Sequence, residues 1–367
     1  SRSKSHAIPL AITAIFCIFT KNESMSSISF SVVGFGRIGQ RHAKIIHEHP
    51  ECTLAAVCDT DAQHFDQRAS LGFPELPTYS DINDLIQAEQ SSGQRSDVVT
   101  IATPNGFHAP YAVKLLRTGY HVVIEKPMGI KSAECEEVLI AEKETGKHVF
   151  VVKQNRYSPP SVWLKDIVQS GTLGDILMVQ TNCYWNRDQR YYSTSPWRGS
   201  LDQDGGALYT QFSHFVDLMY WVFGDITNIQ STVRNFTHPH LKDFDDSGFA
   251  QFEFLRGGIG SINYSTSCWD TNMESSITVV GSKGSVKVGG QYMNEIEYCH
   301  VENYEKPTLP PTNPPNDYGP YKGSAANHHY VFQNVVDVLT GRTDITATAF
   351  EGLKVVQMIE QIYAAAR

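Results

Sequence analysis

The fold is decided by one short stretch near the N-terminus, Ile28-Ser29-Phe30-Ser31-Val32-Val33-Gly34-Phe35-Gly36-Arg37-Ile38-Gly39. Its first half is an apolar strand pattern, and a helical pattern follows the glycines. Glycines at this spacing allow a tight turn, a close approach of the backbone to a ligand and close packing of the helix on the strand. A strand, a glycine loop and a helix in this order predict the first βα unit of a dinucleotide-binding domain.

The second predicted strand, Cys52–Cys58, indicates which dinucleotide binds. It is followed by Asp59, and an acid there accepts both ribose hydroxyls of NAD and repels the 2′-phosphate of NADP. Asp61 adds negative charge, and neither arginine nor lysine follows until Arg68. We therefore predict NAD as the cofactor. The predicted contacts in this region are Gly34, Phe35, Gly36, Arg37, Ile38, Gly39 and Asp59.

Strand and helix patterns alternate over the first part of the chain, which predicts a parallel sheet with helices on both faces. Beyond it, longer strand patterns follow one another across glycine turns, which predicts a mostly antiparallel open sheet. The expected fold class is a Rossmann dinucleotide-binding domain followed by an α+β domain. We assign residues 25–153 to the first domain, 154–345 to a substrate-binding and oligomerisation domain, and 346–367 to a C-terminal helix.

Residues 1–24 stand apart from this pattern. Arg2 and Lys4 precede an apolar run, Ala7–Phe19, that resembles a secretory signal and is too short to span a bilayer. Met25 stands three residues before the first strand pattern, so translated upstream or added sequence is the favoured interpretation. On either interpretation we exclude these residues from the fold.

Composition and charge exclude several classes of protein. Of the 367 residues, 41% are hydrophobic, which suffices for two cores. The net charge of −9 argues against a nucleic-acid binder with a broad basic face. The seven cysteines form no C-x-x-C pair, so reduced thiols in a cytosol-like compartment fit best. We expect a cytoplasmic protein with no metal, membrane or nucleic-acid partner.

Two motifs at predicted strand ends carry the candidate chemistry. Glu125-Lys126-Pro127 follows the strand pattern 121–124, and Thr103-Pro104-Asn105 with His108 follows the strand before it. Ligands of open α/β sheets bind at this carboxyl edge. A lysine placed there can donate to a substrate hydroxyl and stabilise developing negative charge.

The glycine loop, T-P-N-x-x-H and E-K-P together resemble the glucose–fructose oxidoreductase / inositol dehydrogenase / rhizopine catabolism (Gfo/Idh/MocA) family, over residues 28–366. A second family motif, G-G-G-x-x-x-D-x-G-x-H-x-x-D, is matched in part at 204–217, where Thr210 replaces the usual aspartate. On one predicted helix, Leu208–Phe223, the residues Thr210, His214 and Asp217 would share a face. The resemblance implies an NAD-dependent oxidoreductase of CH–OH groups, with Lys126 and His214 as catalytic residues.

Other stretches, at 150–156, 184–187, 197–199 and 276–284, look like UDP-N-acetyl-2-amino-2-deoxyglucuronate dehydrogenases. That resemblance implies oxidation at C3 of a UDP-N-acetyl-aminosugar uronate to a 3-keto nucleotide sugar for surface polysaccharide. It also implies 2-oxoglutarate as the reoxidant of bound NADH. Two alternatives remain. One is a dehydrogenase or dehydratase for a free sugar or inositol, and the other is a non-catalytic NAD-binding regulator.

Residues 151–200 hold six basic and three acidic residues, within an acidic chain. Arginine binds carboxylate and diphosphate oxygens in pairs, and aromatic rings can stack on a uracil or a sugar. The plainer alternative is a solvated basic surface above core aromatics. Further cofactor candidates are Thr103, Asn105, His108, Glu125, Lys126 and Gln154. The substrate candidates are Lys126, Asn155, Arg156, Tyr184, Arg187, Trp197, Arg198, Thr210, His214 and His329.

The predicted antiparallel sheet also indicates an oligomer. Chain order leaves helices for one face only, and alternation along the strands should supply apolar side chains to both faces. A wide, partly apolar open face favours a two-fold dimer through this sheet, and the family resemblance implies that a dimer of dimers can also form. Six prolines within 307–320 predict a stiff exposed loop that reaches towards a neighbouring subunit. The apolar strand residues concerned are Ile229, Val233, Phe252, Phe254, Ile262, Tyr264, Val279 and Val286.

Overall fold

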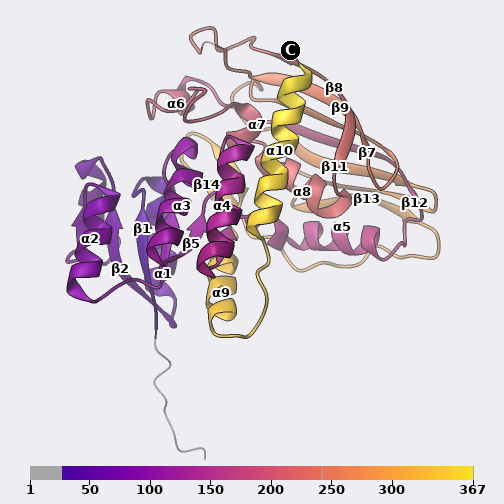
Figure 1. Cartoon of the computed structure of the whole chain (residues 1–367). Coiled ribbons are helices and arrows are strands. Elements are labelled where there is room, and N and C mark those ends of the chain that lie inside the picture. The colour runs from indigo at the N-terminus through magenta and orange to yellow at the C-terminus, as the bar shows by residue number, and fades with distance from the viewer. Residues whose placement is uncertain (1–26, 242, 367) are drawn as a thin grey trace, which may run out of the picture.

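A computed structural model describes residues 27–241 and 243–366, so the predicted leader at 1–24 lies outside the described residues. Figure 1 shows an N-terminal sheet between helices and, beside it, a broad second sheet with helices against one face. Within the described residues, no helix combines the length and apolar character needed to cross a membrane.

The N-terminal sheet has six parallel strands in the order β3-β2-β1-β4-β5-β6. The strand order reverses between β1 and β4, and ligands of doubly wound folds bind at such a switch point. The strands are β1 Ile28–Val33, β2 Cys52–Cys58, β3 Thr78–Tyr79, β4 Val98–Ile101, β5 His121–Ile124 and β6 Val149–Val151. The helices are α1 Arg37–Glu48, α2 Ile82–Ser92, α3 His108–Thr118 and α4 Ser132–Thr145, with 3₁₀ turns η1 Ala62–Arg68, η2 Asn105–Phe107 and η3 Gln154–Tyr157.

The second sheet has seven strands in the order β13-β12-β11-β7-β10-β9-β8, and among them only the β7–β10 pair is parallel. The predicted fold class is thereby confirmed. The strands are β7 Ile176–Tyr184, β8 Ile226–Arg234, β9 Ser247–Phe254, β10 Ile259–Ser265, β11 Glu274–Gly281, β12 Gly284–Gly289 and β13 Glu295–Val301. The helices against it are α5 Pro159–Gln169, α8 Ser213–Phe223 and α10 Ala349–Ala365.

The apolar strand residues do not divide between the two faces as expected. Phe252, Phe254, Ile262, Tyr264, Val279 and Val286 are all buried, on the face that the helices cover. The opposite face carries mostly Ser, Thr, Asn and Gln, with a few exposed apolar side chains such as Phe249 and Ile259. The prediction was wrong on this point because alternation concentrates these residues on one face, leaving the open face more polar.

Three further elements depart from the sequence expectation. The predicted helix Leu208–Phe223 is broken at residues 211–212 into α7 Ala207–Thr210 and α8. The helix α9 His328–Leu339 lies within 154–345, yet it packs on the first domain, with the Phe332 ring against Phe30. The short helix α6 is Gln189–Tyr192, and the proline-rich segment leads into a hairpin of β14 Pro315–Asp317 and β15 Lys322–Ala325.

Candidate active site

A cavity of about 630 Å³ opens at the carboxyl edge of the N-terminal sheet and is closed on its other side by the second domain. This volume lies within the range of ordinary ligand sites. Most of the predicted site residues line it. They are Gly34, Gly36, Arg37, Ile38, Asp59, Thr103, Asn105, His108, Glu125, Lys126, Gln154, Arg187, Trp197, Arg198, Thr210 and His214.

The glycine loop fits the ribose and diphosphate of NAD. A Cβ on Gly34, at φ 89°, would lie 2.5 Å from the Ala102 carbonyl oxygen, whereas one on Gly36 would meet only His64, at 4.0 Å. The Gly36 backbone is therefore open to a ligand. Asp59 accepts from the Phe35 amide at 2.5 Å, and this bond ties the loop to the acid at the end of β2.

Phe35 and Gly39 belong to this loop without lining the cavity. The Phe35 side chain is buried in the core of the first domain. A Cβ on Gly39 would lie 1.7 Å from the Gly34 carbonyl oxygen, so this glycine serves the close packing of α1 on β1. Their contribution to a cofactor site is the shape of the loop.

His108 joins the two motif loops. Its ring nitrogens lie 2.6 Å from the Pro127 carbonyl oxygen and 2.8 Å from the Thr103 carbonyl oxygen. Burial lowers the pKa of His108. The T-P-N-x-x-H and E-K-P motifs therefore hold each other at the carboxyl edge of β4 and β5.

Lys126 and His214 both line the cavity. The Lys126 ammonium donates to the Thr210 carbonyl oxygen at 2.8 Å, and burial lowers its pKa to about 8 although Glu125 opposes the shift. Burial, assisted by the Lys126 charge, holds the pKa of His214 well below its usual value. The imidazole is therefore neutral near pH 7, with Nε2 3.4 Å from the Ser324 hydroxyl. A neutral imidazole beside a lysine of lowered pKa suits proton transfer from a hydroxyl.

Asp204 supplies a carboxylate near the position where the resemblance leads one to expect an aspartate. The Thr210 hydroxyl donates to it and also accepts from the Asn105 amide at 2.8 Å. Burial raises the pKa of Asp204 to about 6. No hydrogen bond joins Asp204 to His214 within residues 27–241 and 243–366, so the acid orders Thr210 and Asn105 rather than the imidazole.

Glu125 lies between two histidines, and no sequence motif pairs either of them with it. Its Oε1 lies 3.0 Å from His42 Nε2 and 3.5 Å from His328 Nε2. Burial alone would raise the pKa of Glu125, but the hydrogen bonds from His328 and His42 hold it well below its usual range. A ring nitrogen of each histidine and a carboxylate oxygen of Glu125 all lie within 4.8 Å of one another. They come from α1, the end of β5 and α9, so no local spacing announces the group.

Two arginines that line the cavity have no carboxylate within 4.0 Å among the described residues. Arg187 is 2% exposed and donates to the Gln211 side chain at 2.7 Å, with Trp185 and Tyr321 each 4.8 Å from its guanidinium. Arg198 lies 3.9 Å from the Tyr191 ring centroid. A buried cation without an anion beside it favours an anionic ligand.

Four predicted substrate residues do not line the cavity. Asn155 is buried, Tyr184 is half-buried outside the cavity, and His329 is exposed, whereas its neighbour His328 lines the cavity. Arg156 is buried in ion pairs with Asp217, at 2.7 Å, and Glu351, at 2.8 Å. Because these acids neutralise Arg156, it joins η3, α8 and α10 and is not available to a ligand.

Known proteins share this architecture. Residues 28–153 match the model of the oxidoreductase family with an NAD-binding Rossmann fold, and 162–287 match the GFO/IDH/MocA C-terminal domain. The WlbA dehydrogenase from Bordetella pertussis, crystallised with NADH and UDP-GlcNAcA, is 31% identical, with a TM-score of 0.81 over 93% of this chain and 97% of that one. The WlbA dehydrogenase from Chromobacterium violaceum, with the same ligands, is 29% identical over 93% and 94% of the two chains, with a TM-score of 0.81.

Curated relatives include an inositol 2-dehydrogenase from Salmonella paratyphi B, 29% identical over 201 residues. That match spans 54% of this chain and 55% of the relative, which is about half the length of each. The two family models, and the similarity to WlbA over nearly the whole chain, agree with the glycine loop and the cavity at the switch point. The chain belongs to the Gfo/Idh/MocA oxidoreductase family and carries its NAD-binding Rossmann domain.

Proposed function

We propose that this protein oxidises the C3 hydroxyl of a UDP-N-acetyl-aminosugar uronate to a 3-keto nucleotide sugar, with NAD as the oxidant. The observation that carries the proposal is the pair Arg187 and Arg198. Both line the cavity beside Lys126 and His214, and neither has a carboxylate partner in the described part of the chain. The similarity to two proteins crystallised with NADH and UDP-GlcNAcA supports the same substrate class.

In this proposal Lys126 and His214 share the work on the hydroxyl. Lys126 donates to the reacting oxygen and stabilises its developing negative charge. His214 accepts the hydroxyl proton, since its lowered pKa leaves one ring nitrogen unprotonated. NAD, when bound, takes the hydride from the ring carbon, so the C–OH group becomes C=O. Asn105, Gln154 and Thr210 position the reactants, with Trp197 beside the sugar nucleotide.

A neutral polyol is the second candidate, favoured by the inositol 2-dehydrogenase relatives. Such a substrate would use Lys126 and His214 in the same way. It would leave the charges of Arg187 and Arg198 without an anion, which is why we place it second.

The test is NADH formation by the purified protein, followed by absorbance, with UDP-GlcNAcA, UDP-GlcNAc, glucose and myo-inositol in parallel. We expect turnover with UDP-GlcNAcA at a kcat/KM at least tenfold above that of the three compounds without a sugar carboxylate, since a charge-assisted contact is worth about 1.5–3 kcal/mol. Preference for inositol or glucose would overturn the substrate assignment. NAD binding without turnover of any compound would favour the regulator.

The same preparation tests the remaining proposals. If NADH is retained after purification, adding 2-oxoglutarate should bleach its absorbance, whereas an unchanged spectrum removes 2-oxoglutarate from the scheme. Cell fractionation tests the proposed cytoplasmic location, where NAD is available.

A further inference from the structure

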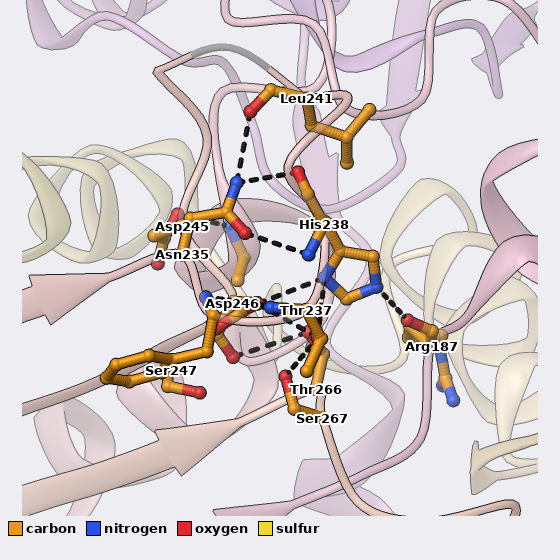
Figure 2. Close-up of polar contacts among 12 residues, drawn as sticks. Arg187, Asn235, Thr237, His238, Leu241, Asp245, Asp246, Ser247, Thr266 and Ser267 are labelled. Carbon is orange, nitrogen blue, oxygen red and sulfur yellow. Dashed lines mark hydrogen bonds and ion pairs between the residues drawn. The ribbon is translucent and has the colours of Figure 1, made fainter.

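His238 connects Arg187, which lines the cavity, to a loop of the second domain (Figure 2). It lies between β8 and β9 and is 3% exposed. Its Nε2 lies 2.6 Å from the Arg187 carbonyl oxygen, and its Nδ1 lies 3.2 Å from Asp246 Oδ2. The imidazole therefore stands between a buried acid and the backbone of the buried arginine.

Asp246 organises the loop that carries His238. Its side chain is 0% exposed and accepts from the amides of Phe236, at 2.9 Å, and Thr237, at 2.7 Å. Burial opposes ionisation, yet hydrogen bonds from His238 and Thr237 hold the pKa of Asp246 well below its usual value. An ionised carboxylate pinned by backbone amides gives His238 a fixed neighbour, as Figure 2 shows.

The orientation of the ring follows from its two neighbours. A carbonyl oxygen only accepts, so Nε2 must carry a hydrogen in the contact with Arg187. Nδ1 is satisfied by donating to Asp246 or by accepting from the Thr237 hydroxyl, which lies 3.1 Å away. The Nε2–H donor is therefore present in the neutral and the charged form of the ring.

Arg187 depends on this donor for the placement of its backbone. Its amide donates to the Thr266 carbonyl oxygen at 2.8 Å, and His238 holds its carbonyl oxygen from the other side. Its guanidinium then reaches Gln211, between α7 and α8, and the Lys322 carbonyl oxygen, at 3.0 Å. The long Arg187 side chain can reach both acceptors at once only if its Cα is held in place. The hydrogen bond from His238 to the Arg187 carbonyl oxygen therefore helps to set the position of the guanidinium.

We propose that His238 is a positioning residue for Arg187, and that it thereby sets the preference of the site for a nucleotide sugar with a sugar carboxylate over one without it. It touches neither the cavity nor the reacting atoms, and it acts only through the Arg187 peptide. The inference rests on the proposed function, because the substrate anion is what Arg187 is placed to meet.

The test compares four variants of the full chain. His238→Phe keeps a ring and removes the donor, while His238→Asn is a smaller change whose amide reaches Asp246 but not Arg187. His238→Gln places an N–H where Nε2 stands. His240→Phe is the matched control, an exposed histidine of the same loop. KM and kcat are measured with UDP-GlcNAcA and with UDP-GlcNAc, which has the same diphosphate but lacks the sugar carboxylate, together with the NAD dissociation constant by fluorescence.

We expect His238→Phe and His238→Asn to raise KM for UDP-GlcNAcA about five- to tenfold, the usual effect of losing one hydrogen bond. The kcat, the NAD dissociation constant and KM for UDP-GlcNAc should stay within about twofold. His238→Gln should recover most of the affinity, and His240→Phe should match the parent. Equal losses on both substrates, or a silent His238→Asn, would overturn the proposal.

A failure of the proposed function is distinguishable from a failure of this inference. If the parent protein oxidises neither sugar nucleotide, the proposed function fails, and crystal structures of the variants decide the role of His238. An Arg187 guanidinium that leaves Gln211 in His238→Asn and keeps it in His238→Gln supports positioning. A guanidinium unmoved in both overturns it.

Discussion

At the residue scale, the site holds one charged group, Lys126, and one neutral group, His214. Lys126 keeps a cation beside the reacting position, while burial keeps His214 neutral. Glu125, ionised between two histidines, is the acid that raises the pKa of Lys126 most. The acid therefore tunes the lysine, and the lysine in turn keeps the imidazole unprotonated. Each of these roles can be tested by a single substitution.

Lys126→Ala and His214→Ala should fold and bind NAD as the parent does, yet lose about 10²–10⁴-fold in kcat, the usual contribution of a positioned acid–base group. Turnover by NADH absorbance, NAD binding by fluorescence and thermal melts measure the three properties. Lys143→Ala, at an exposed position near the end of α4, is the surface control. A variant of either residue with near-parental kcat contradicts the role given to it.

The alkaline side of the pH profile should report Lys126. Its pKa of about 8 means that it is charged below that pH and loses its proton above it, so kcat/KM should fall above about pH 8. Glu125→Gln removes the negative charge that raises this pKa, so the fall should begin at lower pH. Glu137→Gln, an exposed acid on α4, serves as the control. If the fall in kcat/KM begins at the same pH or at a higher pH in Glu125→Gln, the charge of Glu125 does not raise the pKa of Lys126 as stated.

At the element scale, a buried ion cluster joins η3 to two helices of the second domain. Arg156 and Lys153 share the Asp217 carboxylate on α8, at 2.7 and 3.3 Å, and all three side chains are at most 2% exposed. The helix break at 211–212 turns His214 towards the cavity while Asp217 faces this cluster. The histidine and the aspartate of one motif thus serve two purposes, one chemical and one structural.

Asp217→Asn should therefore lower stability much more than it affects chemistry. Removing one partner of a buried ion pair costs about 3–5 kcal/mol in the free energy of unfolding. Urea denaturation measures the loss, and the NAD dissociation constant of the folded variant should stay near the parental value. Glu48→Gln, half of an exposed pair with Lys44, should change stability by less than about 0.5 kcal/mol. If Asp217→Asn lowers the free energy of unfolding no more than this control does, Asp217 does not have the structural role given to it.

At the scale of the whole molecule, the second sheet leaves one face without helices (Figure 1). That face is mostly polar, but it exposes Phe249 by 50%, Ile259 by 56% and Met178 by 44%. These lie on the neighbouring strands β9, β10 and β7. Ile259 and Met178 are directly paired, and exposed apolar side chains on an uncovered sheet face suit packing against a second copy.

Light scattering at micromolar concentration should show a dimer or tetramer, and Ile259→Lys should shift it towards a monomer by burying a charge in the contact. Phe236→Lys, at an exposed loop position, is the control and should leave the assembly unchanged. A monomeric parent, or an assembly indifferent to Ile259→Lys, contradicts packing through this face.

The sequence by itself determined what depends on local spacing. The strand, the glycine loop and the acid at the end of β2 lie within about thirty residues, so their pattern specifies the Rossmann unit and the cofactor. Lys126 and His214 could be named because each sits in a short motif. Tertiary structure alone decided which charges are neutralised. Arg156 and Arg187 look alike in the sequence, but only Arg156 meets a carboxylate, brought to it by a helix some sixty residues away. His238, His42 and His328 likewise acquire their partners from distant elements. Electrostatic interactions act through space, so the pairing of buried charges is fixed only when the helices and sheets pack.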